Sequence, residues 1–200
     1  MLLVKMLDKP AWYDVKTRLL SLGRASVRDF LRQTVTPREG GRVLDVGCGT
    51  GAHGRTFAGR MRYFGVDQNG VYVRHAIARR GEPFAVMDAA KIAFPDGAFD
   101  VVFAVGLFHH LSDAQAVAAA REMRRVTKDN GTALVIDAVL PPQWNLLGRC
   151  LCRWDRGHHV REQAALTALL APEGFRLLLE NIPRSFPYQR AVWVLDVLRS

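Results

Sequence analysis

The sequence has no apolar run close to the roughly 18 residues that a membrane-spanning helix needs. It also has no internal repeat, low-complexity tract or linker, so we expect one domain over residues 1–200. Apolar residues make up 49% and charged residues 24%, which is typical of a globular chain. The apolar stretch 1–7 contains Lys5 and precedes no small-residue cleavage site, which predicts a cytoplasmic protein.

Cysteine is scarce and odd in number. The three cysteines, without an export signal, indicate free thiols in a reducing compartment. Cys150 and Cys152 form a C-x-C close to His158 and His159, but this spacing matches no standard zinc pattern. A zinc site is therefore the weaker interpretation, and we predict no metal.

Acidic residues are in the minority, and the net charge is +9. An excess of cations favours acidic partners, namely nucleic acid, an anionic membrane surface or an anionic small molecule. The chain has no zinc ribbon, RNA-binding module or arginine-rich tail, so nucleic acid is an unlikely partner.

The chain is organised around residues 42–51, which read R-V-L-D-V-G-C-G-T-G. Positions 43–46 indicate a short buried strand, which three glycines interrupt, and a helix is predicted over 52–60. A strand, a glycine turn and a helix start are typical of a site for a nucleotide-like ligand. Asp45 precedes the turn, at the carboxyl end of the strand, where open α/β sheets bind their ligands.

The glycines by themselves fit two kinds of protein. Gly47 to Ala52 satisfy the dinucleotide fingerprint, and Asp67 follows at the distance of a ribose-binding acid, so a nicotinamide oxidoreductase is one hypothesis. However, a carboxylate at Asp45 suits a cationic ligand and would repel a pyrophosphate. The run from Val43 to Gly51 resembles motif I of the class I S-adenosylmethionine (SAM) dependent methyltransferases.

The remaining pattern fits an α/β protein. Hydrophobic periodicity and turn signals predict helical segments within 12–34 and strands and helices alternating from residue 43 onward. Among these are a helix over 114–126 and a turn at 128–131 that leads into the fifth strand. The last two strands are predicted at 175–180 and 191–198. The resemblance implies a three-layer sandwich with a seven-stranded, mostly parallel Rossmann-like sheet of order 3-2-1-4-5-7-6. It also divides the single domain into an N-terminal helical cap (1–38), a SAM-binding core (42–140), a substrate-side insertion (141–172) and closing strands (173–200).

The resemblance further implies SAM as cofactor and a set of residues that bind it. Asp45 and the glycine loop would hold the methionine end, Asp67 the ribose, and Asp88 the adenine amino group, with a helix N-cap as the alternative role for Asp88. The full predicted set is Asp45, Gly47, Cys48, Gly49, Thr50, Gly51, Asp67, Gln68, Asp88, Ala89 and Val105.

Two further groups are predicted to act on the substrate. His109 and His110 stand after the fourth strand, where the resembled family faces the methyl group, and either is a candidate base; packing and helix capping are the alternative roles. Arg156, His158 and Arg161 form a cationic cluster in the insertion, which we expect at the substrate pocket or, equally, in a solvated turn.

These features predict a methyltransferase that acts on a small-molecule, apolar or anionic acceptor. The N-P-P-Y or D-P-P-Y tetrad of enzymes that methylate nucleic-acid amines is absent after strand four. A non-catalytic SAM-binding protein remains an alternative. Tryptophan and leucine alternate with basic residues in 1–16 and 144–154, which predicts either peripheral membrane contact or packing on the sheet.

Overall fold

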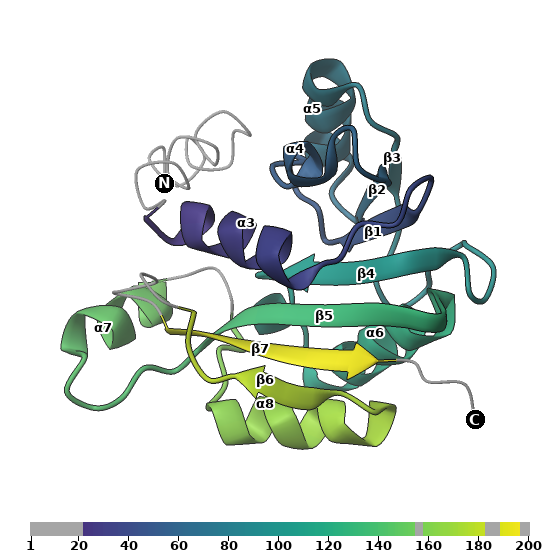
Figure 1. Ribbon diagram of the computed structural model, residues 1–200. Coiled ribbons are helices and arrows are strands. Elements are labelled where there is room, and N and C mark those ends of the chain that lie inside the picture. The colour runs from purple at the N-terminus through teal and green to yellow at the C-terminus, as the bar shows by residue number, and fades with distance from the viewer. Residues whose placement is uncertain (1–21, 155–157, 183–188, 197–200) are drawn as a thin grey trace.

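The computed structural model describes residues 22–154, 158–182 and 189–196. Its centre is one seven-stranded sheet with the order β3-β2-β1-β4-β5-β7-β6, which confirms the predicted order. Strand β7 is antiparallel to both β5 and β6, and the other pairs are parallel. The strands, seen in Figure 1, are β1 (Arg42–Val46), β2 (Arg62–Asp67), β3 (Phe84–Val86), β4 (Phe99–Val105), β5 (Thr127–Val139), β6 (Arg176–Leu179) and β7 (Gln189–Asp196).

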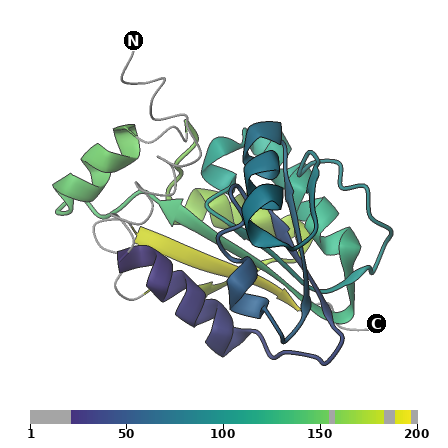
Figure 2. The same ribbon diagram turned by 90° about the horizontal axis from the view of Figure 1, so that it is seen from above.

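Helices cover both faces of this sheet. The helix α3 and the short α4 pack on one face, α6 and α8 pack on the other, and α5 lies against β2 and β3. The views in Figures 1 and 2 show the sheet between them, with α7 projecting beyond the carboxyl end of β5. The helices are α3 (Leu22–Thr34), α4 (Gly54–Phe57), α5 (Gly70–Arg80), α6 (Asp113–Val126), α7 (Leu146–Trp154) and α8 (Gln163–Leu170), with 3-10 turns η1 (Phe108–His110) and η2 (Ala171–Glu173).

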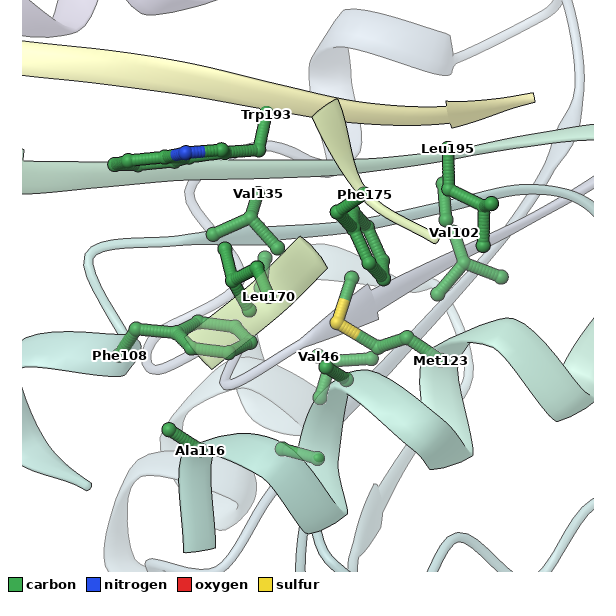
Figure 3. Packing of buried hydrophobic residues seen from close by; sticks show 14 of the residues in the cluster. Val46, Val102, Phe108, Ala116, Met123, Val135, Leu170, Phe175, Trp193 and Leu195 are labelled. Atoms are coloured by element: carbon green, nitrogen blue, oxygen red, sulfur yellow. The ribbon is translucent and has the colours of Figure 1, made fainter. Parts of the chain in front are cut away.

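Apolar side chains point to both faces of the central strands, as burial on two sides requires. Along β1, Val43 joins the core under α3 and α4, whereas Leu44 and Val46 join the core under α6 and α8. Figure 3 shows this second core, in which Phe108, Met123 and Trp193 pack together with α8. All three side chains are fully buried. The segment 106–111 directly after β4, here called the β4 tip, carries Phe108 and is therefore held by the core.

Two elements differ from the sequence predictions. The helix expected over 52–60 is reduced to the four residues of α4, because Gly51 and Gly59 adopt φ of +70° and +72°, outside the helical range. The turn expected at 128–131 lies inside β5, where Asn130 adopts φ of +59° and the pairing with β4 changes register. Asparagine tolerates this left-handed conformation, so the strand continues through an irregularity.

The predicted helix over 114–126 is present as α6, and its start is well defined. The Ser112 hydroxyl accepts from the backbone N–H of Gln115, whose side chain accepts from the N–H of Ser112. This capping box satisfies two backbone donors and determines where the β4 tip ends.

Some predictions lie outside the described residues. Most of the predicted cap (1–38), the apolar and basic stretch 1–16, and Arg156 belong to this part of the chain. Within the described ranges, no helix combines the length and the apolar character needed to cross a bilayer.

Candidate active site at the carboxyl ends of the strands

The glycine loop after β1 is packed too closely to accept side chains. A Cβ added to Gly47 would lie 2.9 Å from Cδ1 of Leu107, and one added to Gly51 would lie 2.6 Å from Cζ of Phe84. Both glycines, and Gly49 between them, also have positive φ. The loop therefore needs glycine for its conformation and for its contact with the β3 and β4 ends.

The amides of this loop donate to the protein. Gly47 and Cys48 both donate to the carbonyl of Val66, at 2.8 and 3.0 Å, and Gly51 donates to the carbonyl of Cys48 at 2.9 Å. Gly49 donates to the Asp67 carboxylate at 2.9 Å. A pyrophosphate site would direct such amides at the ligand. Here the carboxylates of Asp45 and Asp67 lie next to the loop, and they favour a cationic or hydroxyl-bearing ligand.

Asp45 is the most unusual of these groups, because its side chain is buried and only one of its two carboxylate oxygens accepts a hydrogen bond from the described residues. It is 1% exposed, and its Oδ2 accepts from the Tyr63 hydroxyl at 2.7 Å. Its Oδ1 is buried and has no hydrogen-bond partner among the described residues. Burial raises the pKa of Asp45 to about 7, against the lowering effect of the Tyr63 hydroxyl and with a small contribution from Asp67.

Asp67 is oriented by the backbone on two sides. One oxygen accepts from Gly49, and the other accepts from the amide of Asn69 at 2.7 Å. Asn69 in turn caps α5, whose first turns it holds next to the carboxyl end of β2. The half-buried Asp67 carboxylate is thus held in one orientation beside the glycine loop, with exposed Gln68 next to it.

Other predicted cofactor residues lie on the same edge of the sheet. Cys48 and Thr50 are buried in the loop, and burial raises the pKa of the Cys48 thiol, which therefore stays protonated. Val105 is half-buried at the end of β4. Asp88 is exposed after β3, and its carboxylate accepts from the amide of Ala90 at 2.9 Å, in a turn rather than at a helix start. Its predicted alternative role as a helix N-cap is therefore wrong. The half-buried Ala89 lies within this turn.

The β4 tip carries a buried His–Asp pair. Nδ1 of His109 lies 2.6 Å from Oδ1 of Asp137, which is on β5 and 1% exposed. The same carboxylate also accepts from the backbone amides of Phe108 and Ala138. Sequence reasoning missed Asp137; its signal is a lone carboxylate within the apolar run 133–139. His110 is exposed, and its ring centroid lies 4.1 Å from that of His109.

The predicted substrate cluster is divided by the structure. The Arg161 guanidinium donates to the carbonyls of Phe108 and Leu111, at 3.0 and 2.7 Å, and to the Asp113 carboxylate at 2.7 Å. These contacts attach the insertion to the β4 tip. His158 is exposed, and a substrate contact of His158 or Arg161 stays a prediction.

The opposite edge of the sheet carries a broad basic hollow of about 830 Å³. Three of the four cations that line it are ion-paired: Arg121 with Glu173, Arg125 with Glu122 and Asp96, and Lys128 with Asp100. In the described ranges, no three metal-ligating side chains come together. The carboxyl edge is thus the better candidate site.

Comparison with known proteins relates the central part of this chain to methyltransferases. A family model for a methyltransferase domain matches residues 43–131. The chain is 32% identical over 135 residues to a ubiquinone/menaquinone biosynthesis C-methyltransferase of Burkholderia cenocepacia. Residues 43–131 of this chain carry a methyltransferase domain.

This methyltransferase domain also matches a 2-methyl-6-phytyl-1,4-hydroquinone methyltransferase of Synechocystis, at 36% identity over 104 residues. The matches cover 62% of the chain and 55% of the Burkholderia protein, and 48% of the chain and 31% of the Synechocystis protein. The chain therefore spans about half, or less, of the length of these relatives.

Solved structures share the fold of this methyltransferase domain at low sequence identity. The YcgJ protein of Bacillus subtilis superposes with a TM-score of 0.69 at 19% identity, over 88% of this chain and 99% of that one. A SAM-dependent methyltransferase of Aquifex aeolicus gives 0.65 at 21% identity, over 85% and 89%. Both likenesses concern the fold alone.

Proposed function

We propose that the protein transfers the methyl group of SAM to a small-molecule acceptor. The observation that carries this proposal is the unpartnered, buried Oδ1 of Asp45 beside the glycine loop. A buried carboxylate oxygen without a donor is costly, and an ammonium group supplies both a donor and a compensating charge. SAM carries such an ammonium on its methionine end, so the residues present fit this cofactor.

The other predicted cofactor residues have matching chemistry. The Asp67 carboxylate would accept from the ribose hydroxyls, and its two backbone donors keep it aligned for them. Asp88, exposed after β3, would accept from the adenine amino group. When bound, SAM supplies a methyl group made electrophilic by the sulfonium, and the protein aligns the acceptor and removes its proton.

For the acceptor, we propose an apolar molecule with a hydroxyl-bearing ring. Of the relatives named above, one is a 2-methyl-6-phytyl-1,4-hydroquinone methyltransferase and the other a ubiquinone/menaquinone biosynthesis C-methyltransferase. In this chain, α7 and the residues before it lie next to the carboxyl end of β5 and expose Trp144, Leu146 and Leu147, at 76%, 74% and 56%. An exposed apolar surface of this kind is typical of a contact with an apolar molecule or with a membrane that contains it.

A methyl-transfer assay tests this proposal. Purified protein and methyl-labelled SAM are incubated with 2-methyl-6-phytyl-1,4-hydroquinone and with shorter-chain 1,4-hydroquinones, and labelled product is extracted into organic solvent. Calorimetry measures SAM binding in parallel. We expect binding and turnover. SAM binding without turnover on any acceptor supports the non-catalytic alternative, whereas NADH binding without SAM binding supports the oxidoreductase.

We further propose that α7 contacts an anionic membrane surface. The exposed Trp144 precedes α7, and α7 itself exposes Leu146, Leu147 and Arg153, in a chain with net charge +9. Aromatic and aliphatic side chains enter the headgroup region, and each cation near anionic lipid adds about 1 kcal/mol. Such contact would bring the site next to a bilayer that contains the acceptor.

Vesicle co-sedimentation tests this contact. We expect binding to anionic but not to neutral vesicles, and loss of binding in high salt. The double variant Trp144→Ala/Leu147→Ala should bind less than wild type. The matched control is Ile77→Ala/Val86→Ala, which removes two other exposed apolar side chains and should bind as wild type. Equal binding of the two double variants would argue against α7.

A further inference from the structure

We infer that Asp137 and His109 form a proton-accepting pair for the methyl acceptor, with Asp137 as the positioning residue. This inference rests on the proposed methyl transfer and adds a role for a residue that the family comparison leaves unassigned. It assigns the acceptor proton to Nε2 of His109, while Nδ1 faces Asp137.

The geometry of the carboxylate determines the protonation of the ring. Asp137 accepts from the amides of Phe108 and Ala138, so both of its oxygens already act as acceptors. A contact of 2.6 Å between Oδ1 and Nδ1 then requires the ring to donate. In the neutral ring, Nδ1 therefore carries the hydrogen, and Nε2 is the basic nitrogen.

The pair lies close to the predicted cofactor loop. Leu107, two residues before His109, packs against Gly47, where an added Cβ would lie 2.9 Å from it. Gly106 directly follows β4 with φ of +66°, and a Cβ there would lie 3.5 Å from Cε1 of His109. The His109 side chain is 10% exposed. Asp137, by contrast, has a fully buried side chain and can act only through the ring.

The segment that carries the pair is held firmly. The carbonyls of Phe108 and Leu111 accept from Arg161, and the amide of His159 donates to the carbonyl of His109 at 3.0 Å. A base held in one position loses little entropy on reaction, which favours proton transfer. Residues that are used only for packing would not require a charged partner for the imidazole.

The proposed step conserves atoms and charge. The acceptor O–H bond breaks, and its proton forms an N–H bond at Nε2. The electron pair left on oxygen, directly or through a conjugated ring carbon, bonds to the methyl carbon, while the electrons of the C–S bond remain on sulfur. When carbon is methylated, the ring hydrogen returns to the oxygen, so one proton leaves in net. The Asp137 carboxylate offsets the charge of the resulting imidazolium.

Several charged or titratable groups lie on the elements next to this ring. An anion at Nδ1 stabilises the imidazolium and moves the acid limb of the rate profile to higher pH, whereas nearby cations oppose this. The groups whose charges stabilise or destabilise the imidazolium are Asp137 on β5, His110 on η1, Asp113 on α6, and His159 and Arg161 before α8.

The first experiment uses the wild-type protein and needs no acceptor. Nitrogen NMR of histidine-labelled protein reports which ring nitrogens carry hydrogen, and the variant His109→Gln identifies the resonance among the six histidines. We expect Nδ1 to be protonated throughout and Nε2 to lose its proton as pH rises. A neutral ring with hydrogen on Nε2 would overturn the pair, whether or not turnover is observed.

The second experiment measures turnover with 2-methyl-6-phytyl-1,4-hydroquinone, or with the best acceptor of the hydroquinone series. His109→Gln should lower kcat by about 10²- to 10⁴-fold and leave the Kd for SAM unchanged. Asp137→Asn should also lower kcat and move the acid limb to lower pH. The matched control is Asp129→Asn, the same change at an exposed position of the same strand, which should keep the wild-type profile.

These outcomes separate the role of the pair from the proposed function. If no acceptor reacts although SAM binds, the methyltransferase proposal fails, and the NMR result still decides the pair. If turnover occurs and His109→Gln retains kcat within about twofold, the pair is structural only. If Asp137→Asn does not fold, the wild-type NMR titration and His109→Gln still provide the test.

Discussion

Asp45 is predicted to lower the stability of the protein in the absence of cofactor, in a manner that depends on pH. Burial raises the pKa of Asp45 from 3.8 to about 7. Between these two values the folded state binds more protons than the unfolded state, so stability falls as pH rises through this window. Each pH unit corresponds to about 1.4 kcal/mol, so ionising Asp45 in the folded protein costs on the order of 4 kcal/mol.

The variant Asp45→Asn removes the ionisation and retains the shape of the side chain. Its amide oxygen still accepts from Tyr63, while its NH₂ group replaces the unpartnered Oδ1 and costs about 1–3 kcal/mol at every pH. The constant term cancels when the two proteins are compared across pH. The free energy of unfolding of Asp45→Asn, relative to wild type, should therefore rise by about 2–3 kcal/mol from pH 5 to pH 8.

Urea unfolding at several pH values measures this difference. The slope m should be equal for the two proteins, so that a change in midpoint reports stability. Asp129→Asn, the same change at an exposed position, is the control for the general effect of removing a carboxylate. Parallel pH curves for wild type and Asp45→Asn would refute the argument that burial dominates at Asp45.

The remaining predictions concern the cofactor site and the β4 tip. Asp67→Ala should weaken SAM binding about 10- to 100-fold in calorimetry, because it removes the acceptor for the ribose hydroxyls; unchanged affinity in the folded variant would contradict this role. SAM affinity should rise as Asp45 ionises between pH 5 and pH 7, and Asp45→Asn should lose this dependence. Ser112→Ala should lower the free energy of unfolding by about 1 kcal/mol in urea, because the capping box is lost, and Ser112→Thr should restore most of it.

Much of the fold was predictable because its signals are local. Short apolar strands, positive-φ glycines and capping residues act within a few neighbours, and the strand order came with the resemblance to a known family. The limits of α4 and β5 were mispredicted because the backbone conformations of Gly59 and Asn130 also depend on the residues that pack around them. The sequence pattern of a segment does not show how strongly its tertiary neighbours stabilise one backbone conformation.

The site was predictable only in part, and for the same reason. The glycine loop and the acids at the strand ends could be predicted from the sequence, because spacing along the chain places them on one edge of the sheet. The partners of those acids could not, because they come from distant parts of the chain. It buried Asp45 against Tyr63, 18 residues away, and brought Asp137 to His109 across 28 residues. Desolvation and hydrogen bonding depend on such distant neighbours, and they determine the protonation of a carboxylate or an imidazole.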